Sequence, residues 1–378
     1  MNFQFFDKLS KISAANWSKC NKTSTLLTSY QLFKAFEDSQ SACVTSGWQP
    51  HHLVMENKHG IQGIMPLYIK QHSWGEYVFD WDWADAFHRN NIAYYPKLVS
   101  TIPFTPITSN KLLSEHRPLS ETFNLLTEHC LNNEINSWHV LYCAELPVNQ
   151  IKKLPNDVYQ RNTVQFHWFN RDYQSFDDFV DTFTSRKRKN TRKERLSMGE
   201  QGLQIRRIKG SKITQQELAF FYLSYQTTYL KKGHQPHLNA DFFEQLITNL
   251  ADNVLLIIAS HQGNDVACAL FFYDHNTLYG RYWGCVDYYA NLHFELCYYQ
   301  GIEFCIEKKL KQFNPGTQGE HKIQRGFEPV LTYSYHWIKH QAFKQAIKDF
   351  CHVERQQMEK YRLQCQQALP FKNKSSKT

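Results

Sequence analysis

The sequence predicts an α+β protein with mixed sheets, built from two domains of similar topology. The chain has 378 residues, which is longer than one hydrophobic core usually organises. Both halves show the same order of predicted elements, in which helices precede strands and a further helix follows. Both halves also contain an apolar strand, a glycine-containing turn and a second apolar strand, at 52–69 and 254–273. These three observations indicate a duplicated fold.

The spacing of apolar residues predicts the elements of each half in turn. In the first half they are helices around 12–20 and 30–39, strands at 52–56, 63–69 and 76–81, a helix over 117–133 and a strand at 138–143. In the second half they are helices over 214–231 and 240–250, strands at 254–260, 266–273 and 277–286, a helix over about 293–310 and a short strand at about 311–314.

A polar segment at 152–162, which contains Pro155, Asn156 and Asp157, is typical of a connection between domains. We therefore expect an N-terminal domain over 1–155 and a second domain over 163–345. A C-terminal helix and a basic tail would then occupy 346–378.

The composition indicates a globular protein in a reducing compartment. Hydrophobic residues make up 42% of the chain and aromatic residues 15%, which excludes the disordered class. The sequence has no apolar run long enough to cross a membrane, and Met1–Asp7 lacks the basic and then apolar pattern of a signal peptide. The ten cysteines are scattered without a C-x-x-C pair. We therefore expect a cytoplasmic protein with no transmembrane segment and with reduced thiols.

The net charge of +8 is concentrated in one run, Arg186–Arg195, which holds seven basic residues and one acidic residue. If this run is helical, six of the basic side chains share one half of the helix surface and repel one another. A solvated face is the ordinary interpretation of such a run, and an anionic partner is the alternative that we favour. The residues expected to bind phosphate are Arg186, Arg188, Lys189 and Arg192.

Several blocks of the sequence resemble a known bacterial family. They lie at 75–85, 94–97, 103–106, 165–168, 185–190, 279–284, 293–299 and 318–322. The chain is similar in these blocks to the predicted N-acyltransferases, also described as peptidoglycan biosynthesis or recognition proteins. That family is in turn similar to the Fem-type transferases, which consist of two tandem GNAT-like domains.

The resemblance implies transfer of an acyl or aminoacyl group to an amine, which the family places on a peptidoglycan precursor. The donor it implies is acyl-CoA or aminoacyl-tRNA, and tRNA would then be a partner. In GNAT enzymes a glycine-containing turn wraps the coenzyme A pyrophosphate. The corresponding turn here, 287–293, contains no glycine, which disfavours acetyl-CoA because tight wrapping of a pyrophosphate is easier with glycine.

The loop 315–326 is the first candidate for the chemistry, because it is polar, rich in glycine and follows a predicted central strand. We expect Glu320 and His321 to act in catalysis, one as proton acceptor for the attacking amine and the other as its orienter or a substrate contact. Lys322 and Arg325 would hold phosphate oxygens. The alternative is a structural hairpin whose charges face water.

Three acids lie among aromatic residues in the first half, where Asp80 is the second candidate for a proton acceptor. Asp82 and Asp85 would bind an ammonium group, or would only open a helix as first-turn acids. In the second half Arg281 requires a partner, either Glu295 or an anionic group of the substrate. The remaining residues expected to contact substrate are Trp283, His293 and Glu295, which lie in the matching blocks.

The sequence contains no zinc-ligand motif, no Ser-His-Asp signature and no P-loop, so we expect no metal. Acyl transfer to an amine requires a base and oxyanion donors, which fits this absence. A competing hypothesis is a non-catalytic module that recognises an anionic glycan precursor or RNA through its basic helix and aromatic residues.

Overall fold

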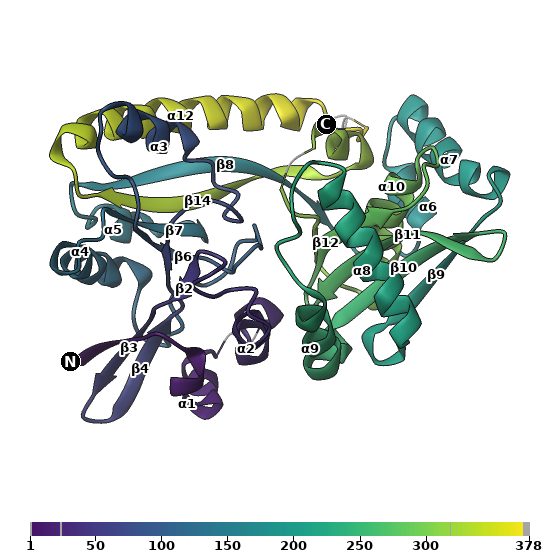
Figure 1. Cartoon of the computed structure of the whole chain (residues 1–378). Helices are drawn as coiled ribbons and strands as arrows, with labels where there is room; N and C mark the ends of the chain where they lie inside the picture. The colour runs from purple at the N-terminus through teal and green to yellow at the C-terminus, as the bar shows by residue number, and fades with distance from the viewer. Residues whose placement is uncertain (1, 23–24, 318, 373–378) are drawn as a thin grey trace. The chain divides into compact units, whose positions relative to one another are not determined.

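The computed structural model describes residues 2–22, 25–317 and 319–372, which fall into two units (Figure 1). Unit 1 contains Met1–Val164 and Leu331–Tyr361, and unit 2 contains Gln165–Val330 and Arg362–Thr378. The contacts therefore group 331–361 with the first half, whereas the sequence placed 331–345 in the second domain. The cause is strand β14 (Glu328–Ile338), which pairs with a strand of unit 1. Residues 373–378 of the expected basic tail lie outside the described residues.

The expected connection at 152–162 is not a linker, because strand β8 (Val158–Phe169) begins inside it. The sheet of unit 1 has the strand order β2-β5-β6-β7-β14-β8, and a smaller antiparallel sheet has the order β1-β3-β4. Within the larger sheet β6 and β7 are parallel, whereas β2–β5, β5–β6 and β7–β14 are antiparallel. The remaining strands are β1 (Asn2–Phe6), β2 (Trp48–Pro50), β3 (His52–Asn57), β4 (Gly60–Met65), β5 (Tyr68–Lys70), β6 (Lys97–Ser100) and β7 (Ser137–Cys143).

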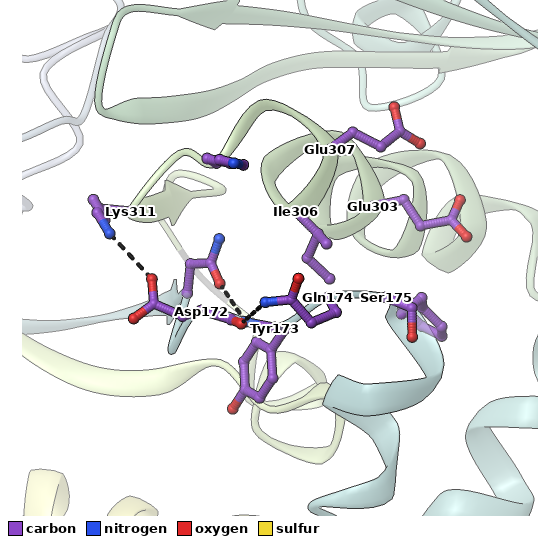
Figure 2. Close-up of a pocket in the computed structure, with 11 residues that line it drawn as sticks. Asp172, Tyr173, Gln174, Ser175, Glu303, Ile306, Glu307 and Lys311 are labelled. Carbon is purple, nitrogen blue, oxygen red and sulfur yellow. Dashed lines mark hydrogen bonds and ion pairs between the residues drawn. The ribbon is translucent and has the colours of Figure 1, made fainter.

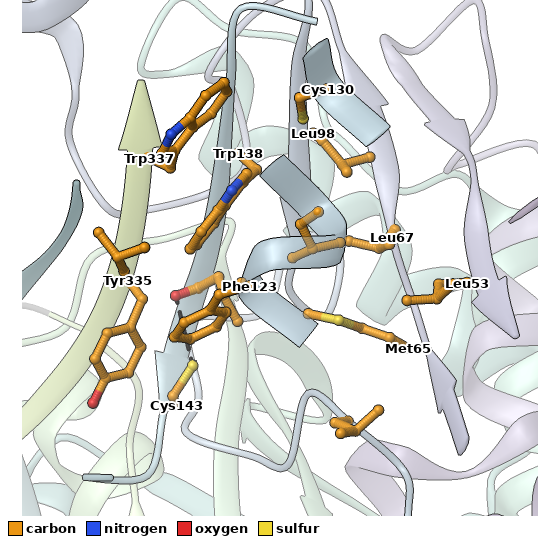
Figure 3. Close-up of a cluster of buried hydrophobic side chains, with 14 of the residues drawn as sticks. Leu53, Met65, Leu67, Leu98, Phe123, Cys130, Trp138, Cys143, Tyr335 and Trp337 are labelled. Atoms are coloured by element: carbon orange, nitrogen blue, oxygen red, sulfur yellow. Dashed lines mark hydrogen bonds between the residues drawn. The ribbon is translucent and has the colours of Figure 1, made fainter. Parts of the chain in front are cut away.

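Helices cover both faces of the larger sheet of unit 1 (Figure 1). On one face Trp138 and Trp337 pack with Phe123 of α4 in a buried apolar cluster (Figure 3). On the other face Trp83 of α3 and Ile347 of α12 belong to a second cluster. Successive side chains of a strand point to opposite faces of the sheet, so the neighbours Trp337 and Ile338 pack in different clusters. The helices are α1 (Ala14–Cys20), α2 (Tyr30–Asp38), α3 (Trp81–Arg89), α4 (Phe123–Asn132), α5 (Val148–Ile151) and α12 (Gln341–Gln367).

The sheet of unit 2 has the strand order β8-β13-β12-β11-β10-β9. Strands β12 and β13 are parallel, and the other pairs with recorded registers are antiparallel. Strands β10 and β11 form a hairpin whose turn residues, Gln262 and Gly263, both have positive φ, as the favoured two-residue turn requires. The strands are β9 (Leu203–Lys209), β10 (Val254–His261), β11 (Asn264–Tyr273), β12 (Thr277–Cys285) and β13 (Gln312–Asn314).

Helices of unit 2 pack closely on its strands. Tyr225 of α8 meets Tyr282 of β12 with ring centres 5.3 Å apart. Gly301 of α11 lies so close to β13 that a Cβ there would be 2.6 Å from the ring of Phe313. The helices are α6 (Phe176–Asp181), α7 (Ser185–Glu200), α8 (Gln215–Leu230), α9 (Ala240–Leu250), α10 (Leu292–Phe294) and α11 (Gln300–Lys308), with a π-helix at Glu295–Tyr299 and a 3-10 helix at Glu320–Arg325.

Each unit follows the same path through its elements. In unit 1 a strand and two helices (β1, α1, α2) precede the antiparallel strands β3 and β4, the strand β6, the helix α4 and the strand β7. In unit 2 the same order is β9, α8, α9, β10, β11, β12, α10 with α11, and β13. In both units the last two strands of this series are parallel neighbours. The predicted duplication is therefore present.

The strand predicted at 76–81 is wrong, because residues 76–80 are irregular and α3 begins at Trp81. Its alternating aromatic residues resemble a strand, but Tyr77 has a φ of 61° and Glu76 and Asp80 both contact Lys97. The counterpart of β12 in unit 1 is therefore β6 (Lys97–Ser100) and not this segment.

Candidate functional site

The 3-10 helix Glu320–Arg325 lies directly after β13, at the carboxyl end of the parallel pair β12 and β13. This is the end of a strand at which folds with parallel strands usually bind ligands. Gly319 and Gly326 flank the helix with φ of 102° and 81°, a region that favours glycine. A Cβ at Gly319 would lie 2.3 Å from the ring of His321. The segment expected to be a loop is therefore a short helix held between two glycines.

His321 is exposed, and its Nε2 lies 2.8 Å from the hydroxyl of Tyr298 on the π-helix. Partial burial and the nearby cations Lys322 and Arg325 lower its pKa. The imidazole is therefore neutral near pH 7 and has a nitrogen that can accept a proton. Glu320 is also exposed beside it. Tyr298 was not among the candidate residues, because a contact between a helix and a distant segment leaves no signal in the local sequence.

Lys322 is only 2% exposed, and its ammonium donates to the carbonyl oxygens of Gly316 at 3.0 Å and Thr317 at 3.1 Å. Burial lowers its pKa to about 7. The sequence predicted that Lys322 would hold a phosphate oxygen. In the structure its Nζ instead donates to backbone carbonyl oxygens and is buried.

Arg325 is also buried and ion-paired. Its guanidinium donates to both carboxylate oxygens of Glu194 at 2.8 and 2.9 Å and to the carbonyl oxygen of His321 at 2.8 Å. The guanidinium carbon lies 3.4 Å from the ring centre of Phe294. Glu194 also accepts a hydrogen bond from Tyr299. Arg325 therefore fixes the 3-10 helix to α7 and is not free for the phosphate expected from the sequence. Glu194 was missed, although it is the one acid in the basic run.

Aromatic rings surround the exposed side of this cluster. The ring centre of His293 lies 5.1 Å from that of Trp283 and 6.1 Å from that of His321. Burial lowers the pKa of His293 to about 4, and the neighbouring ring of His321 and the cation Arg325 act in the same direction. Arg281 lies over the ring of Tyr282 at 5.0 Å. The structure thus places His293 between Trp283 and His321, and the expected contact of His293 and Trp283 with substrate stays a prediction.

Of the two alternatives for Arg281, a pairing with Glu295 is not recorded among the described residues. Glu295 is buried and accepts from Arg195 at 3.0 and 3.2 Å, and Arg195 also pairs with Glu303 at 2.7 Å. Glu295 belongs to the π-helix and Glu303 to α11, so Arg195 joins α7 to both of these helices.

The basic run is helical, as predicted, because it forms most of α7. Acids of unit 2 pair with three of its seven basic residues, Arg188, Arg192 and Arg195, which the sequence did not reveal. Arg192 pairs with Asp177 at 3.0 Å and with Asp181 at 3.1 Å, and Arg188 lies 3.6 Å from Asp181. Within the part of the chain that the structure describes, no ion pair is recorded for the exposed residues Arg186, Lys189 and Lys193.

Asp80 is buried in unit 1, where its Oδ2 accepts from Lys97 at 2.5 Å and from Tyr94 at 2.6 Å. Burial alone would raise the pKa of Asp80, but Lys97 and His139 outweigh it and hold the pKa below its usual value. An ionised, ion-paired Asp80 with a lowered pKa is a poor proton acceptor, which argues against its place as the second candidate for that role. Asp82 lies exposed in the first turn of α3, and Asp85 pairs with Arg89 at 3.1 Å.

A surface groove of about 590 Å³ lies in unit 2 between the segment 170–176 and α11 (Figure 2). Its charged groups are largely paired, since Lys311 reaches Asp172 at 3.2 Å and Glu307 pairs with Arg207 at 2.7 Å. The charged groups of the groove therefore take part in ion pairs within unit 2.

A family model described as FemAB-like, peptidoglycan biosynthesis/recognition, matches residues 8–373. The chain belongs to this family. No curated protein sequence matches the chain. The family membership agrees with the resemblance seen in the sequence blocks, and it associates the chain with peptidoglycan biosynthesis or recognition.

Solved structures share the fold of this FemAB-like chain. The C-terminal domain (DUF2156) of a candidate lysylphosphatidylglycerol synthetase from Agrobacterium fabrum has a TM-score of 0.56 at 8% identity, over 92% of this chain and 97% of that one. A conserved protein from Bacteroides thetaiotaomicron gives 0.53 at 12% identity, over 89% and 100%. FemX gives 0.51 at 12% identity, over 92% and 100%. The predicted fold, two tandem GNAT-like domains with mixed sheets, is confirmed.

Two further observations concern the described residues of the chain alone. None of their helices has the length and apolar character needed to cross a membrane. Nor do they contain three or more His, Cys, Asp or Glu side chains grouped to hold a metal ion.

Proposed function

We propose that this FemAB-like chain transfers an acyl or aminoacyl group from an activated donor to an amine, with His321 as the proton acceptor. Membership of a peptidoglycan biosynthesis/recognition family and the tandem GNAT-like fold support a transferase. The observation that carries the proposal is the position of His321, which is exposed at the carboxyl end of β13 and held 2.8 Å from Tyr298.

The proton balance of the reaction explains the role of each group. The amine nitrogen attacks the acyl carbonyl, a C–N bond forms, and the C–O or C–S bond to the donor breaks. His321 takes the proton that the amine must lose and passes it to the leaving oxygen or sulfur. Lys322 and Arg325 favour the neutral ring that can accept this proton, because both lower the pKa of His321. The exposed carboxylate of Glu320 would bind the incoming ammonium before deprotonation.

Aminoacyl-tRNA is the donor that we favour over acyl-CoA. The turn 287–293, which precedes and opens α10, contains no glycine and has Asn291 at a φ of 63°. The exposed basic residues Arg186, Lys189 and Lys193 of α7 are the groups available to phosphates. A peptidoglycan precursor is the amine acceptor that the family description supports. A tRNA donor would place the reaction in the cytoplasm.

The test is transfer of a radiolabelled amino acid from aminoacyl-tRNA to a panel of amine-bearing peptidoglycan precursors. His321→Ala should lower the rate by about 10²- to 10⁴-fold, the usual cost of losing a general base, while donor binding persists. Glu320→Gln should mainly raise KM for the amine. The matched control is His88→Ala, which removes an exposed histidine of α3.

The pH profile gives a second readout. The wild-type rate should rise with pH through an apparent pKa below 6.5, since His321 must be neutral to act and its pKa is lowered. Near wild-type turnover by His321→Ala would show that the base lies elsewhere. Tight tRNA or precursor binding with no product from any donor in wild-type protein would support the non-catalytic recognition module instead.

A further inference from the structure

Unit 1 contains a buried lysine for which no carboxylate partner is recorded among the described residues. Lys111 is 4% exposed and lies in the connection between β6 and α4. Among the described residues, the hydrogen bond recorded for its Nζ is to Ser109 Oγ, at 2.6 Å. Burial lowers the pKa of Lys111 to about 8. The one ionisable group recorded as acting on it is Cys143, whose own pKa burial raises to about 12, so that thiol is uncharged.

The backbone around this pair is fixed to the sheet. The N–H of Ser109 donates to the carbonyl oxygen of Tyr142 at 3.1 Å, near the carboxyl end of β7. Further along the segment, Leu113 and Ile64 exchange two backbone hydrogen bonds of 2.8 and 2.9 Å. Strands β6 and β7 are parallel, so Ser109 and Lys111 lie where parallel strands usually offer a ligand site. Ser109 is partly exposed, so its hydroxyl can meet a ligand.

We propose that Ser109 and Lys111 form a Ser–Lys nucleophilic pair that accepts an acyl group from an activated ester or thioester. A serine hydroxyl is a weak nucleophile unless an adjacent base takes its proton, and a neutral lysine amine is one such base. The contact of 2.6 Å lets the lone pair of the neutral amine accept the hydroxyl proton directly.

The step balances without another reactant. The bond from Ser109 Oγ to the acyl carbon forms, and the bond from that carbon to the leaving oxygen or sulfur breaks. The hydroxyl proton moves to Lys111 Nζ and then to the leaving group, which departs as an alcohol or thiol. Water or an amine can later release the acyl group by the reverse use of the same lysine.

A purely structural lysine is the alternative. It is energetically poor here, because a buried ammonium without a carboxylate loses its hydration and regains only one hydrogen bond to a hydroxyl. An apolar side chain of similar length would fill the same space without that cost. The pair is also independent of His321, so its test requires neither tRNA nor a peptidoglycan precursor.

The experiment uses the full chain and 4-nitrophenyl acetate as the probe. Release of 4-nitrophenolate gives the rate, and peptide mass spectrometry locates the acetyl group. We expect one acetyl group on Ser109, with a rate that rises with pH as the amine of Lys111 becomes neutral. Ser109→Ala should abolish this modification, and Lys111→Met should slow it by about 10²- to 10⁴-fold.

Ser114→Ala is the matched control, because Ser114 lies in the same segment but donates to the carbonyl oxygen of Gln62 at 2.9 Å. It should leave acetylation of Ser109 unchanged. The proposal is overturned if Ser109 carries no acetyl group, if labelling spreads over exposed lysines alone, or if Lys111→Met reacts as fast as wild type. Ser109→Ala decides the same question should Lys111→Met fail to fold, since it leaves the lysine in place.

Discussion

Replacing Lys97 by methionine tests the buried charge cluster of unit 1. Lys97 is fully buried and donates to Ser73 at 2.7 Å, to Glu76 at 2.8 Å and to Asp80 at 2.5 Å. Its removal leaves the two buried carboxylates of Glu76 and Asp80 without this ammonium. Glu76 would still have Lys70 as an ion-pair partner, but at a distance of 4.0 Å. Breaking a buried ion pair by removing one partner typically costs about 3–5 kcal/mol of unfolding free energy, and we expect Lys97→Met to fall in that range.

The loss should depend on pH in a definite direction. In wild type the pKa of Asp80 is lowered, so its contribution to stability is present above its unfolded pKa and is lost as pH falls through the folded value. Burial already raises the folded pKa of Glu76 in wild type; without Lys97 that pKa would rise further, and the folded pKa of Asp80 would rise above its unfolded value. Two raised carboxyl pKa values destabilise the fold at neutral pH, and protonation relieves this as pH falls. The deficit of Lys97→Met should therefore shrink between about pH 7 and pH 5.

Urea unfolding at both pH values measures the deficit, and hydrogen exchange of peptides from β6 and β7 assigns it to unit 1. Lys34→Met is the matched control, since Lys34 forms an exposed pair with Asp38 four residues along α2 and should lose no more than about 0.5 kcal/mol. Asp80→Asn in the Lys97→Met background should restore part of the stability. A loss below about 1 kcal/mol, or one that is equal at both pH values, would refute an ionised cluster held by Lys97.

Two further changes test unit 2. Charge reversal of Arg186 and Lys189 should weaken tRNA binding and lower the slope of log affinity against log salt by about one unit for each phosphate that is no longer neutralised. Fluorescence anisotropy from about 50 to 200 mM salt measures this slope. Reversal of Arg192, which is already ion-paired, should change the slope less, and equal slopes for the two variants would contradict the prediction. Glu194→Gln should cost about 1–3 kcal/mol in urea unfolding, because Arg325 keeps a hydrogen-bond acceptor but loses its charge partner; an unchanged midpoint would mean that this pair does not hold the 3-10 helix.

The periodic spacing of apolar residues predicted the helices and strands in which the buried side chains follow the same period. The helix around 30–39 and the strand at 254–260 correspond to α2 and β10, where apolar spacing and burial agree. The segment 76–81 failed because its aromatic alternation is the pattern of a strand, whereas Glu76 and Asp80 turn toward Lys97. A contact with a residue this far along the chain leaves no periodic signal in the segment itself.

The position of the candidate site stays a prediction, but the structure shows which local features the sequence could and could not reveal. Glycines and polar residues after a short strand pointed to 320–325, where the structure has the 3-10 helix. The sequence showed the positive charges of α7 but not the acids that pair with them, since Asp181 lies on α6 and Glu303 on α11. Exposure was equally hidden, because Lys322 has the same local surroundings in sequence as a surface lysine and yet is 2% exposed.

Three of the four buried lysines among the described residues show how close carboxylates change the pKa of a buried amine. Burial opposes the charge of all three, but Glu76 and Asp80 raise the pKa of Lys97 above its usual value, so it stays an ammonium. Lys322 and Lys111 have no such partners, and their pKa values fall to about 7 and about 8. The lysine with carboxylates holds an irregular segment in place. Lys111 lies beside Ser109, where a neutral amine would serve the proton transfer that we propose, whereas the Nζ of Lys322 is held by the carbonyl oxygens of Gly316 and Thr317.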